Sequence, residues 1–171
     1  SSPTPTPLPV ITPPAGQWTE VGAGSASNGG ISNNSGASRL PSLALSSGGA
    51  PYVAWQDQTA GNWEVYGRWF DGATWQEIGA GAASGGGISN NSGGSGERPP
   101  SLALDASNTP YVAWDDTTAG NFEVYGRQFD GTGWVAMGAG AATGGGASNH
   151  PPAPWCSRTG GRTDGRPPRG G

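Results

Sequence analysis

The stretch PSLALSSGGAPYVAWQDQTAGNWEVYGRWFDGATWQEIGAGAASGGG, which begins at Pro41, decides the fold because it returns almost unchanged. The second copy begins at Pro100 and reads PSLALDASNTPYVAWDDTTAGNFEVYGRQFDGTGWVAMGAGAATGGG, an offset of 59 residues. An earlier half-unit, GQWTEVGAGSASNGGISNNSG, begins at Gly16 and matches the end of both copies. Repetition at a fixed spacing is the signature of folds built from stacked units, each burying its sides against the next.

Each unit contains four short apolar segments that predict β-strands, with turn-forming residues between them. In the first unit the expected strands are 41–45, 52–55, 64–70 and 75–78. In the second they are 100–104, 111–114, 123–129 and 134–137. Asp-Gly follows Phe70 and Phe129 and predicts a tight hairpin, since Gly tolerates positive φ. No window keeps a 3.6-residue apolar period, so no helix is expected.

Both faces of the third strand carry apolar side chains. Val65, Gly67 and Trp69 share one face, while Tyr66 and Phe70 lie on the other with Glu64 and Arg68. A sheet packed between two neighbours needs this pattern, whereas a sheet with one wet face alternates more cleanly. We therefore expect an all-β chain of β-propeller blades: two four-stranded antiparallel units plus a partial one. A β-sandwich or β-solenoid is the competing architecture.

The composition divides the chain into three parts. Residues 1–15 form a Pro/Thr-rich linker of the kind that holds an exposed domain away from a bacterial envelope. Residues 16–150 hold the propeller repeats, as a partial unit 16–40, a unit 41–99 and a unit 100–150. Residues 151–171 form an Arg/Gly/Pro-rich tail that we expect to be disordered, and an out-of-frame translation, because a third unit should begin there.

The repeat resembles a known family at the residues PSLAL, PYVAW, EVYGR-x-FDG and the linker GAG-x-x-x-x-GGISN. It is similar to the propeller repeats of large extracellular proteins from filamentous and other environmental bacteria, with sialidase-like or kelch-like blades. The resemblance covers residues 16–150 and implies a propeller fold and an extracellular or cell-surface location. The sialidase Asp-box S-x-D-x-G-x-T-W is not met, because the units read FDGATW and FDGTGW.

The net charge, the length of the apolar runs and the low number of histidines argue against several classes of function. The formal net charge is −4, and residues 1–150 hold four Arg against eleven acids, a net of −7, which argues against nucleic-acid binding. No apolar run is long enough for a transmembrane helix, so no membrane insertion is expected. A catalytic triad would have to use the single histidine, His150, and nothing in the sequence supplies the arrangement around it. A zinc site lacks the His and Cys ligands that it would need. We therefore expect no catalytic residues, no metal and no cofactor.

The candidate ligand-binding residues lie in the polar turn between the second and third strands of each unit. An aromatic side chain stands beside an asparagine and after an aspartate; the candidates are Trp63, Phe122, Asn62, Asn121, Asp57 and Asp116. An aromatic platform with amides nearby suits a sugar, and interblade packing is the alternative role for both aromatics. The aspartates alternatively cap the turn. Pairing with Glu64 or Glu123 offers carboxylates for glycoside hydrolysis or Ca²⁺, but without Ca²⁺-loop spacing.

The remaining tryptophans and the glycine-rich linker have structural interpretations. Trp55 and Trp114 end an apolar strand and are expected in the core. Trp18, Trp75 and Trp134 follow the hairpin and are expected to wedge between blades. The GAGAASGGGISNNSG linker lacks the lysine of a phosphate-binding loop and is expected to be a flexible interblade connection.

The sequence thus predicts a non-catalytic extracellular propeller module for adhesion or recognition, with glycans or surface proteins as partners. One alternative is a fragment of a propeller-type glycoside hydrolase whose active site lies in missing blades, and another is a purely structural surface stalk. Two and a half blades cannot close a ring of about four to eight. We therefore expect an incomplete propeller that depends on missing sequence or, as the second option, self-associates through open blade edges.

Overall fold

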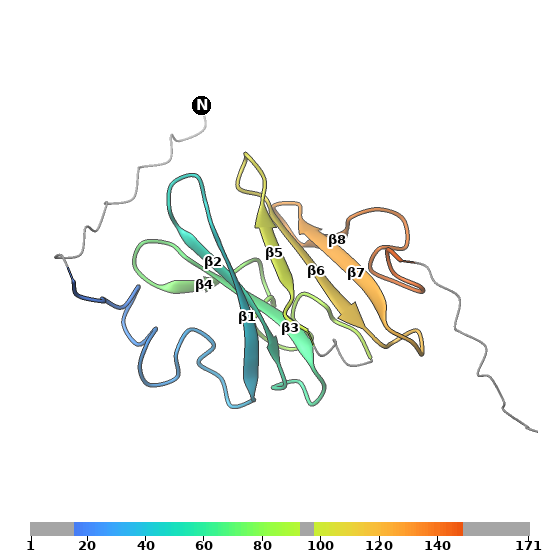
Figure 1. Cartoon of the computed structure of the whole chain (residues 1–171), viewed down its shortest axis with the longest axis horizontal. Coiled ribbons are helices and arrows are strands. Elements are labelled where there is room, and N and C mark those ends of the chain that lie inside the picture. Colours follow the sequence, from blue (N-terminus) through green and yellow to red (C-terminus); the bar gives the residue numbers. More distant parts are fainter. Residues whose placement is uncertain (1–15, 93–97, 149–171) are drawn as a thin grey trace, which may run out of the picture.

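A computed structural model describes residues 16–92 and 98–148, which form two four-stranded antiparallel sheets and contain no helix (Figure 1). The first sheet consists of β1 (Ser38–Leu45), β2 (Pro51–Asp57), β3 (Glu64–Phe70) and β4 (Trp75–Glu77). The second consists of β5 (Ser101–Leu104), β6 (Pro110–Asp116), β7 (Glu123–Phe129) and β8 (Trp134–Ala136). The all-β prediction is confirmed, while the predicted segments 1–15 and 151–171 lie outside the described residues.

Each sheet is a simple meander in which consecutive strands pair, and the two registers match. Ala54 faces Gly67 in the first sheet and Ala113 faces Gly126 in the second. Strands β3 and β7 have the predicted bounds, but β2 and β6 run two residues past the expected end. The extension arises because Asp57 still pairs with Glu64, so this aspartate ends a strand instead of lying in a turn.

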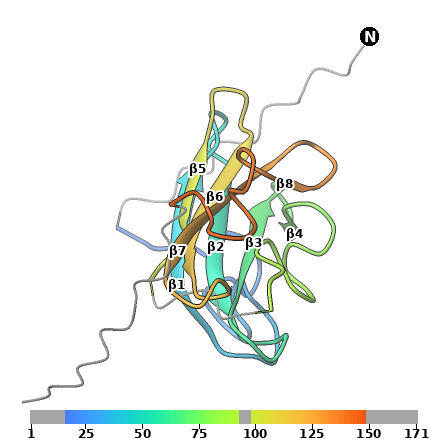
Figure 2. The same cartoon turned by 90° about the vertical axis from the view of Figure 1, so that its right-hand side faces the viewer.

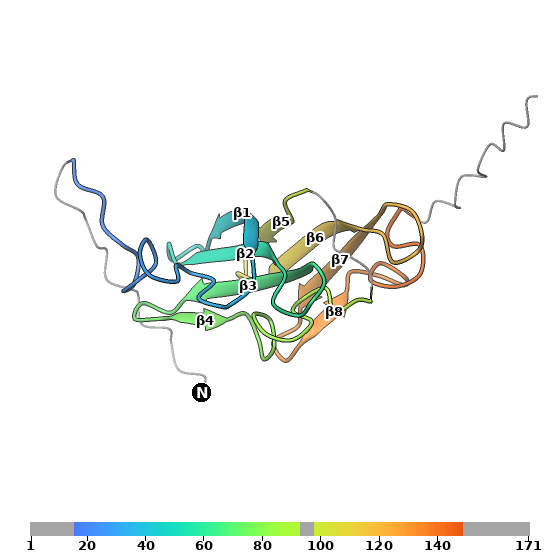
Figure 3. The same cartoon turned by 90° about the horizontal axis from the view of Figure 1, so that it is seen from below.

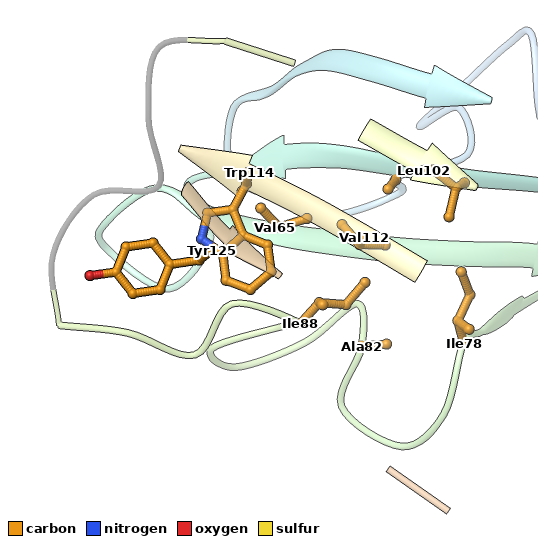
Figure 4. Packing of buried hydrophobic residues seen from close by; sticks show 9 residues of the cluster. Val65, Ile78, Ala82, Ile88, Leu102, Val112, Trp114 and Tyr125 are labelled. Atoms are coloured by element: carbon orange, nitrogen blue, oxygen red, sulfur yellow. The ribbon is translucent and has the colours of Figure 1, made fainter. Parts of the chain in front are cut away.

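The two sheets pack face to face with their strands in the same order, so that β1 lies beside β5 (Figures 2 and 3). The backbone amide of Leu102 in β5 donates to Ser42 Oγ in β1 at 3.2 Å. Between the sheets lies an apolar cluster to which Val65 of β3 and Val112 of β6 belong (Figure 4). Two sheets buried against each other through apolar faces are the predicted blades, and they do not close a ring.

The connection between the sheets, residues 79–92, is part of this core, and we call it the middle linker. Its residues Ala82 and Ile88 are buried between the sheets. On one side, the Gly67 amide donates to Ala82 O at 2.7 Å and the Ile88 amide donates to Val65 O at 2.6 Å. The expectation of a flexible connection is therefore wrong, because this segment forms backbone hydrogen bonds along β3.

Close packing of the linker explains two glycines. A Cβ on Gly67 would lie 2.9 Å from Ile88 Cδ1 and 3.1 Å from Ile78 Cδ1, so the strand leaves room there for both isoleucines. Gly79 has φ +85°, and a Cβ would lie 2.4 Å from Cε2 of Phe129 in the second sheet. Glycine is required at these points because the linker and the neighbouring sheet approach the backbone closely.

The tryptophans mostly follow the expectation. Trp55 and Trp114 are buried, as predicted. Trp75 and Trp134 are half-buried, and their Nε1 atoms donate to Val21 O at 2.7 Å and Ile78 O at 2.8 Å. Trp134 packs against the cluster between the two sheets, as expected, whereas Trp75 packs against a separate cluster on the other side of the first sheet. The prediction was wrong for Trp18, which is fully exposed because no sheet of the described chain packs against it.

The glycine contacts predict a difference between two substitutions in the middle linker. Gly79→Ala and Gly81→Ala both place a side chain at a φ near +80°, which costs about 1–2 kcal/mol. Only Gly79→Ala also meets the Phe129 ring, whereas nothing lies within 4 Å of a Cβ on Gly81. We expect Gly79→Ala to be the less stable variant by a further 1–3 kcal/mol, roughly. Urea unfolding measures both, and equal losses would contradict the interblade contact.

Candidate functional site

The predicted site residues lie at the end of each sheet where the second strand turns into the third. Asp57 is fully buried, and its carboxylate accepts four hydrogen bonds. The donors are Trp55 Nε1 at 2.8 Å, Ser38 Oγ at 2.8 Å, the Thr59 amide at 2.9 Å and the side-chain amide of Asn34. The contact with Thr59 is the turn cap that the sequence offered as an alternative role.

Asp116 occupies the equivalent place in the second sheet and is also fully buried. It accepts hydrogen bonds from the Thr118 amide at 2.6 Å and from the side-chain amide of Asn91. Asn91 belongs to the middle linker, just as Asn34 belongs to residues 16–37, which we call the first linker. Both aspartates therefore fasten a linker to the sheet that follows it.

The two asparagine candidates turn toward the protein. Asn62 Nδ2 donates to Glu64 Oε1 at 2.8 Å and to the Asn91 carbonyl at 3.1 Å. Asn121 Nδ2 donates to Glu123 Oε1 at 2.6 Å. Both glutamates are buried, and buried carboxylates need hydrogen-bond donors. The asparagines therefore act mainly as donors to Glu64 and Glu123, at the β2–β3 and β6–β7 turns.

The two aromatic candidates differ in their surroundings. Trp63 is half-buried, and the Arg39 guanidinium lies 3.8 Å from its ring centroid, which covers one face of the indole. Phe122 is 58% exposed. The six predicted residues thus belong to two similar turns, one on each sheet. The two aspartates are buried, whereas the asparagines and the aromatic rings keep some exposed surface.

Neighbouring carboxyl groups at this end have pKa values shifted in opposite directions. Burial would raise the pKa of Asp57, but hydrogen bonds from Thr59, Trp55 and Asn34 outweigh it and lower the pKa below its ordinary value. Burial raises the pKa of Glu64 despite hydrogen bonds from Ser89 and Asn62. The nearby charge of Asp116 adds to the rise for Glu64, while each hydrogen bond to an ionised carboxylate favours the ionised form and lowers the pKa.

A different concave site lies at the opposite end of the sheets, between the two blades, and we call it the interblade pocket. Its volume is about 310 Å³. The first sheet and its linker contribute Tyr52, Trp69, Ile78 and Gly79; the second sheet contributes Ser107, Asn108, Thr109, Pro110 and Phe129. No lining residue carries a formal charge, so the pocket suits a neutral ligand.

Two stacked aromatic rings form one wall of the interblade pocket. The Tyr52 and Trp69 centroids are 5.7 Å apart with an interplanar angle of 23°. They are cross-strand partners on β2 and β3, which fixes their spacing. Burial raises the pKa of Tyr52 above its ordinary value, so its hydroxyl stays protonated at neutral pH.

The polar wall is the β5–β6 hairpin of the second sheet. Asp105 accepts from the Ser107 and Thr109 amides, both at 2.8 Å, and so fixes the turn. Asn108 has φ +63° and accepts from the Ser47 amide at 2.7 Å. Since Ser47 lies on the β1–β2 hairpin, this contact holds the two blades together beside the pocket.

Sequence reasoning missed the interblade pocket, although one signal pointed to it. The units read EVYGRWF and EVYGRQF, so Trp69 is replaced by Gln128 at the equivalent position. The first hairpins differ as well, with SSGGAP in one unit and DASNTP in the other. Differences between otherwise matching units mark places where structure does not dictate the residue.

Two further searches of the described residues gave negative results. Within 16–92 and 98–148, no three or more His, Cys, Asp or Glu side chains are grouped as a metal site would require. No helix in that part of the chain has the length and hydropathy of a membrane span.

Comparisons with known proteins give one weak similarity. No protein-family model matches the chain, and no curated protein matches it. Among solved structures, the chain is similar to a fucose lectin from Kordia zhangzhouensis in complex with methyl-fucoside, at 14% identity and a TM-score of 0.37. The match covers 56% of this chain and 60% of the lectin chain, so the chain spans about three fifths of that protein.

The carboxylate environment predicts a pH-dependent effect of Asp57→Asn. Four hydrogen-bond donors surround the Asp57 carboxylate, which accepts from all of them. The side-chain amide of the asparagine would present its own N–H groups to some of these donors, so we expect the variant to lose about 1–3 kcal/mol of folding stability at pH 7. Since the pKa of Asp57 is lowered by folding, its stabilisation is present above the ordinary aspartate pKa and is lost as pH falls through the folded-state pKa. Denaturant unfolding of both proteins should therefore show their stability difference shrinking under acid; a constant difference would contradict it.

Proposed function

We propose that this chain is a non-catalytic propeller module that recognises glycans through the interblade pocket. The observation that carries the proposal is the stacked pair Tyr52–Trp69 opposite the Ser107–Asn108–Thr109 hairpin. The C–H face of a sugar ring packs on aromatic rings, while its hydroxyl groups exchange hydrogen bonds with amides and hydroxyls. The pocket offers both kinds of wall at once.

The size and charge of the pocket narrow the ligand class. A volume of about 310 Å³ is at the small end of ligand sites and leaves room for one sugar ring. The lining residues are uncharged, so we infer a neutral monosaccharide, free or at the end of a longer glycan. An acidic sugar would lose the solvation of its carboxylate and find no cation among the lining residues.

The buried carboxylates favour binding over hydrolysis. Glycoside hydrolysis needs two carboxyl groups that reach the scissile bond. Asp57 and Glu64 are fully or almost fully buried and accept hydrogen bonds from their own turn and linker. They also lie at the end of the first sheet opposite the pocket. We therefore propose that the carboxylates have a structural role and that the chain performs no chemistry.

An extracellular setting completes the proposal. The Pro/Thr-rich residues 1–15 have the composition of a spacer between an envelope and an exposed domain. A glycan-binding module at the end of such a spacer would serve adhesion or surface recognition. Surface proteins remain the alternative partner, and a purely structural stalk remains the alternative function.

The proposal predicts that Trp69→Ala weakens sugar binding. Removing one of the two rings takes away half of the apolar wall, so we expect the Kd to rise at least about tenfold, equivalent to roughly 1.4 kcal/mol. The measurement is isothermal titration with methyl glycosides of neutral monosaccharides, after a glycan array has selected the sugar. Trp69 fluorescence should also change on binding in the unmodified chain.

Gln128→Ala is the matched control, because Gln128 holds the position of Trp69 in the second unit but does not line the pocket. It should bind as the unmodified chain does. Trp63→Ala and Phe122→Ala test the turns that the sequence indicated. Loss of binding in those variants, with Trp69→Ala unaffected, would move the site to the turns; no binding to any glycan would favour the stalk.

A further inference from the structure

The first sheet has a face on which Leu43 and Leu45 are exposed beside the buried Val53, and we call this the front face. The second sheet carries the same residues at Leu102, Leu104 and Val112, and Leu102 and Val112 are buried there in the cluster between the sheets. Leu102 is 8% exposed, whereas Leu43 is 63% exposed. The same side chain is buried in one unit and exposed in the other, so the front face is an interface that lacks its second half.

The second sheet has the complementary open face, which we call the back face, formed by Val124, Val135 and Met137. Val65 is the equivalent of Val124 and is completely buried against the second sheet, whereas Val124 is 48% exposed. Met137 is likewise exposed where its equivalent Ile78 is buried. The front and back faces are thus the two halves of the interface already seen between the sheets.

The first linker packs on the front face of the first sheet in the same way as the middle linker packs on the equivalent face of the second sheet. Arg68 Nη1 donates to Ile31 O at 2.7 Å, and Arg127 Nη1 donates to Ile88 O at 2.8 Å. The middle linker also bonds to a sheet on its other side, through the Ile88 amide and Val65 O. The first linker has no such sheet among the described residues.

A cavity marks the place of this absent sheet. It measures about 740 Å³ and lies between the front face and the first linker, with Leu43, Leu45 and Val53 on one side and Val21, Ala26 and Ile31 on the other. Between the two sheets of the chain, the same space is filled by Ala54 and Val65. An apolar opening of this size on a monomer indicates a binding surface.

We propose that the occupant is a second copy of this chain, which places the back face of its second sheet on the front face and first linker of its neighbour. The reason is that the chain already contains an equivalent interface, with the same leucines and valine on the front half and with Val124 and Met137 in place of Val65 and Ile78 on the back half. The contact is head to tail, because the two faces differ and each copy carries one of each. The bonds of Ile88 with Val65 and Arg127 would then recur with Ile31, Val124 and Arg68.

Residues 138–148, which we call the last linker, already lie along β7. The last linker must therefore leave β7 before the first linker of a neighbouring copy can bind there. The last linker bonds to β7 through the Gly126 amide and Ala141 O at 2.7 Å and through the Ala147 amide and Val124 O at 2.5 Å. It carries Ala147 where the other two linkers carry Ile31 and Ile88. The first linker of a neighbour would fill the apolar space better and replace it.

Ring closure sets the number of copies. Propellers use about four to eight blades, so if each copy contributes the two sheets of residues 16–92 and 98–148, a ring closes with two to four copies. If the proposed sugar site is correct, these added interfaces would not repeat it. Gln128 replaces Trp69 there, and Gly48 and Gly49 replace Ser107 and Asn108. Each chain would therefore contribute one sugar site to the ring.

The test measures the mass of the full chain in solution by sedimentation and light scattering as its concentration rises. We expect one discrete assembly of two to four copies. This assembly should form whether or not the chain binds a glycan, so the two proposals can fail separately. Leu43→Glu blocks the front face and Val124→Glu blocks the back face, and each alone should remain monomeric. Both residues are exposed in the single chain, so folding, checked by circular dichroism, should be unchanged. Ala119→Glu, on an exposed turn, is the charge control and should assemble.

Mixing the two blocked variants is the decisive experiment, because each retains the face that the other lacks. The mixture should form a one-to-one dimer and stop there. A monomeric unmodified chain, self-association of Leu43→Glu alone, or a mixture that stays monomeric would overturn the proposal. Growth without a limiting size would overturn the closed ring.

A separate variant tests whether the first linker of a neighbouring copy replaces the last linker on β7. Ala147→Ile gives the last linker the isoleucine of the other two, so it should hold its place on β7 and weaken assembly at least about tenfold while raising the stability of the single chain. Unchanged assembly would show that no exchange takes place.

Discussion

The structure depends on the way Ile88 connects two sheets at once. Its backbone N–H bonds to Val65 O of the sheet before it, its carbonyl accepts from Arg127 of the sheet after it, and its side chain occupies the room left by Gly67. Separating the sheets would leave buried backbone groups without partners, which is costly in addition to the loss of apolar contact. A glycine-rich segment thereby becomes the most constrained part of the interface.

This arrangement gives the two ends of the sheets different freedom. At the β2–β3 end, Asp57 and Glu64 hold the linkers through buried hydrogen bonds. Burial raises the pKa of Glu64, whereas hydrogen bonds outweigh burial at Asp57 and lower its pKa. Most polar groups there are engaged with the protein itself. At the other end, the hairpins meet through Asn108 and Ser47 and leave a pocket between them. Recognition is therefore easier to build at the hairpin end, where residues are free to change without loosening the interface.

The fold could be predicted from sequence because its signals are local and occur twice. Alternation along residues 64–70 and 123–129 and the Asp-Gly turns fixed strands with the observed bounds. The interblade pocket could not be predicted from the sequence, because Trp69 and Asn108 come from different sheets and neither unit alone shows that they lie close together. The burial of Asp57 and of the linker was missed for a related reason. Polar and glycine-rich segments indicate exposed turns unless the neighbouring sheet that supplies their partners is known.

The differences between the two units separate structure from function more clearly than either unit alone. Every unit must contact its neighbours in the same way, so the segment EVYGR is identical in both. A ligand needs its own residues only where it binds, and Trp69 and Asn108 lie in the proposed sugar site, with Gln128 and Gly49 as their equivalents. Each chain holds one such proposed site, so copies joined head to tail would present several sites at once. Assembly would then provide the avidity that the small pocket lacks, since linked sites bind a multivalent surface far more tightly than separate ones.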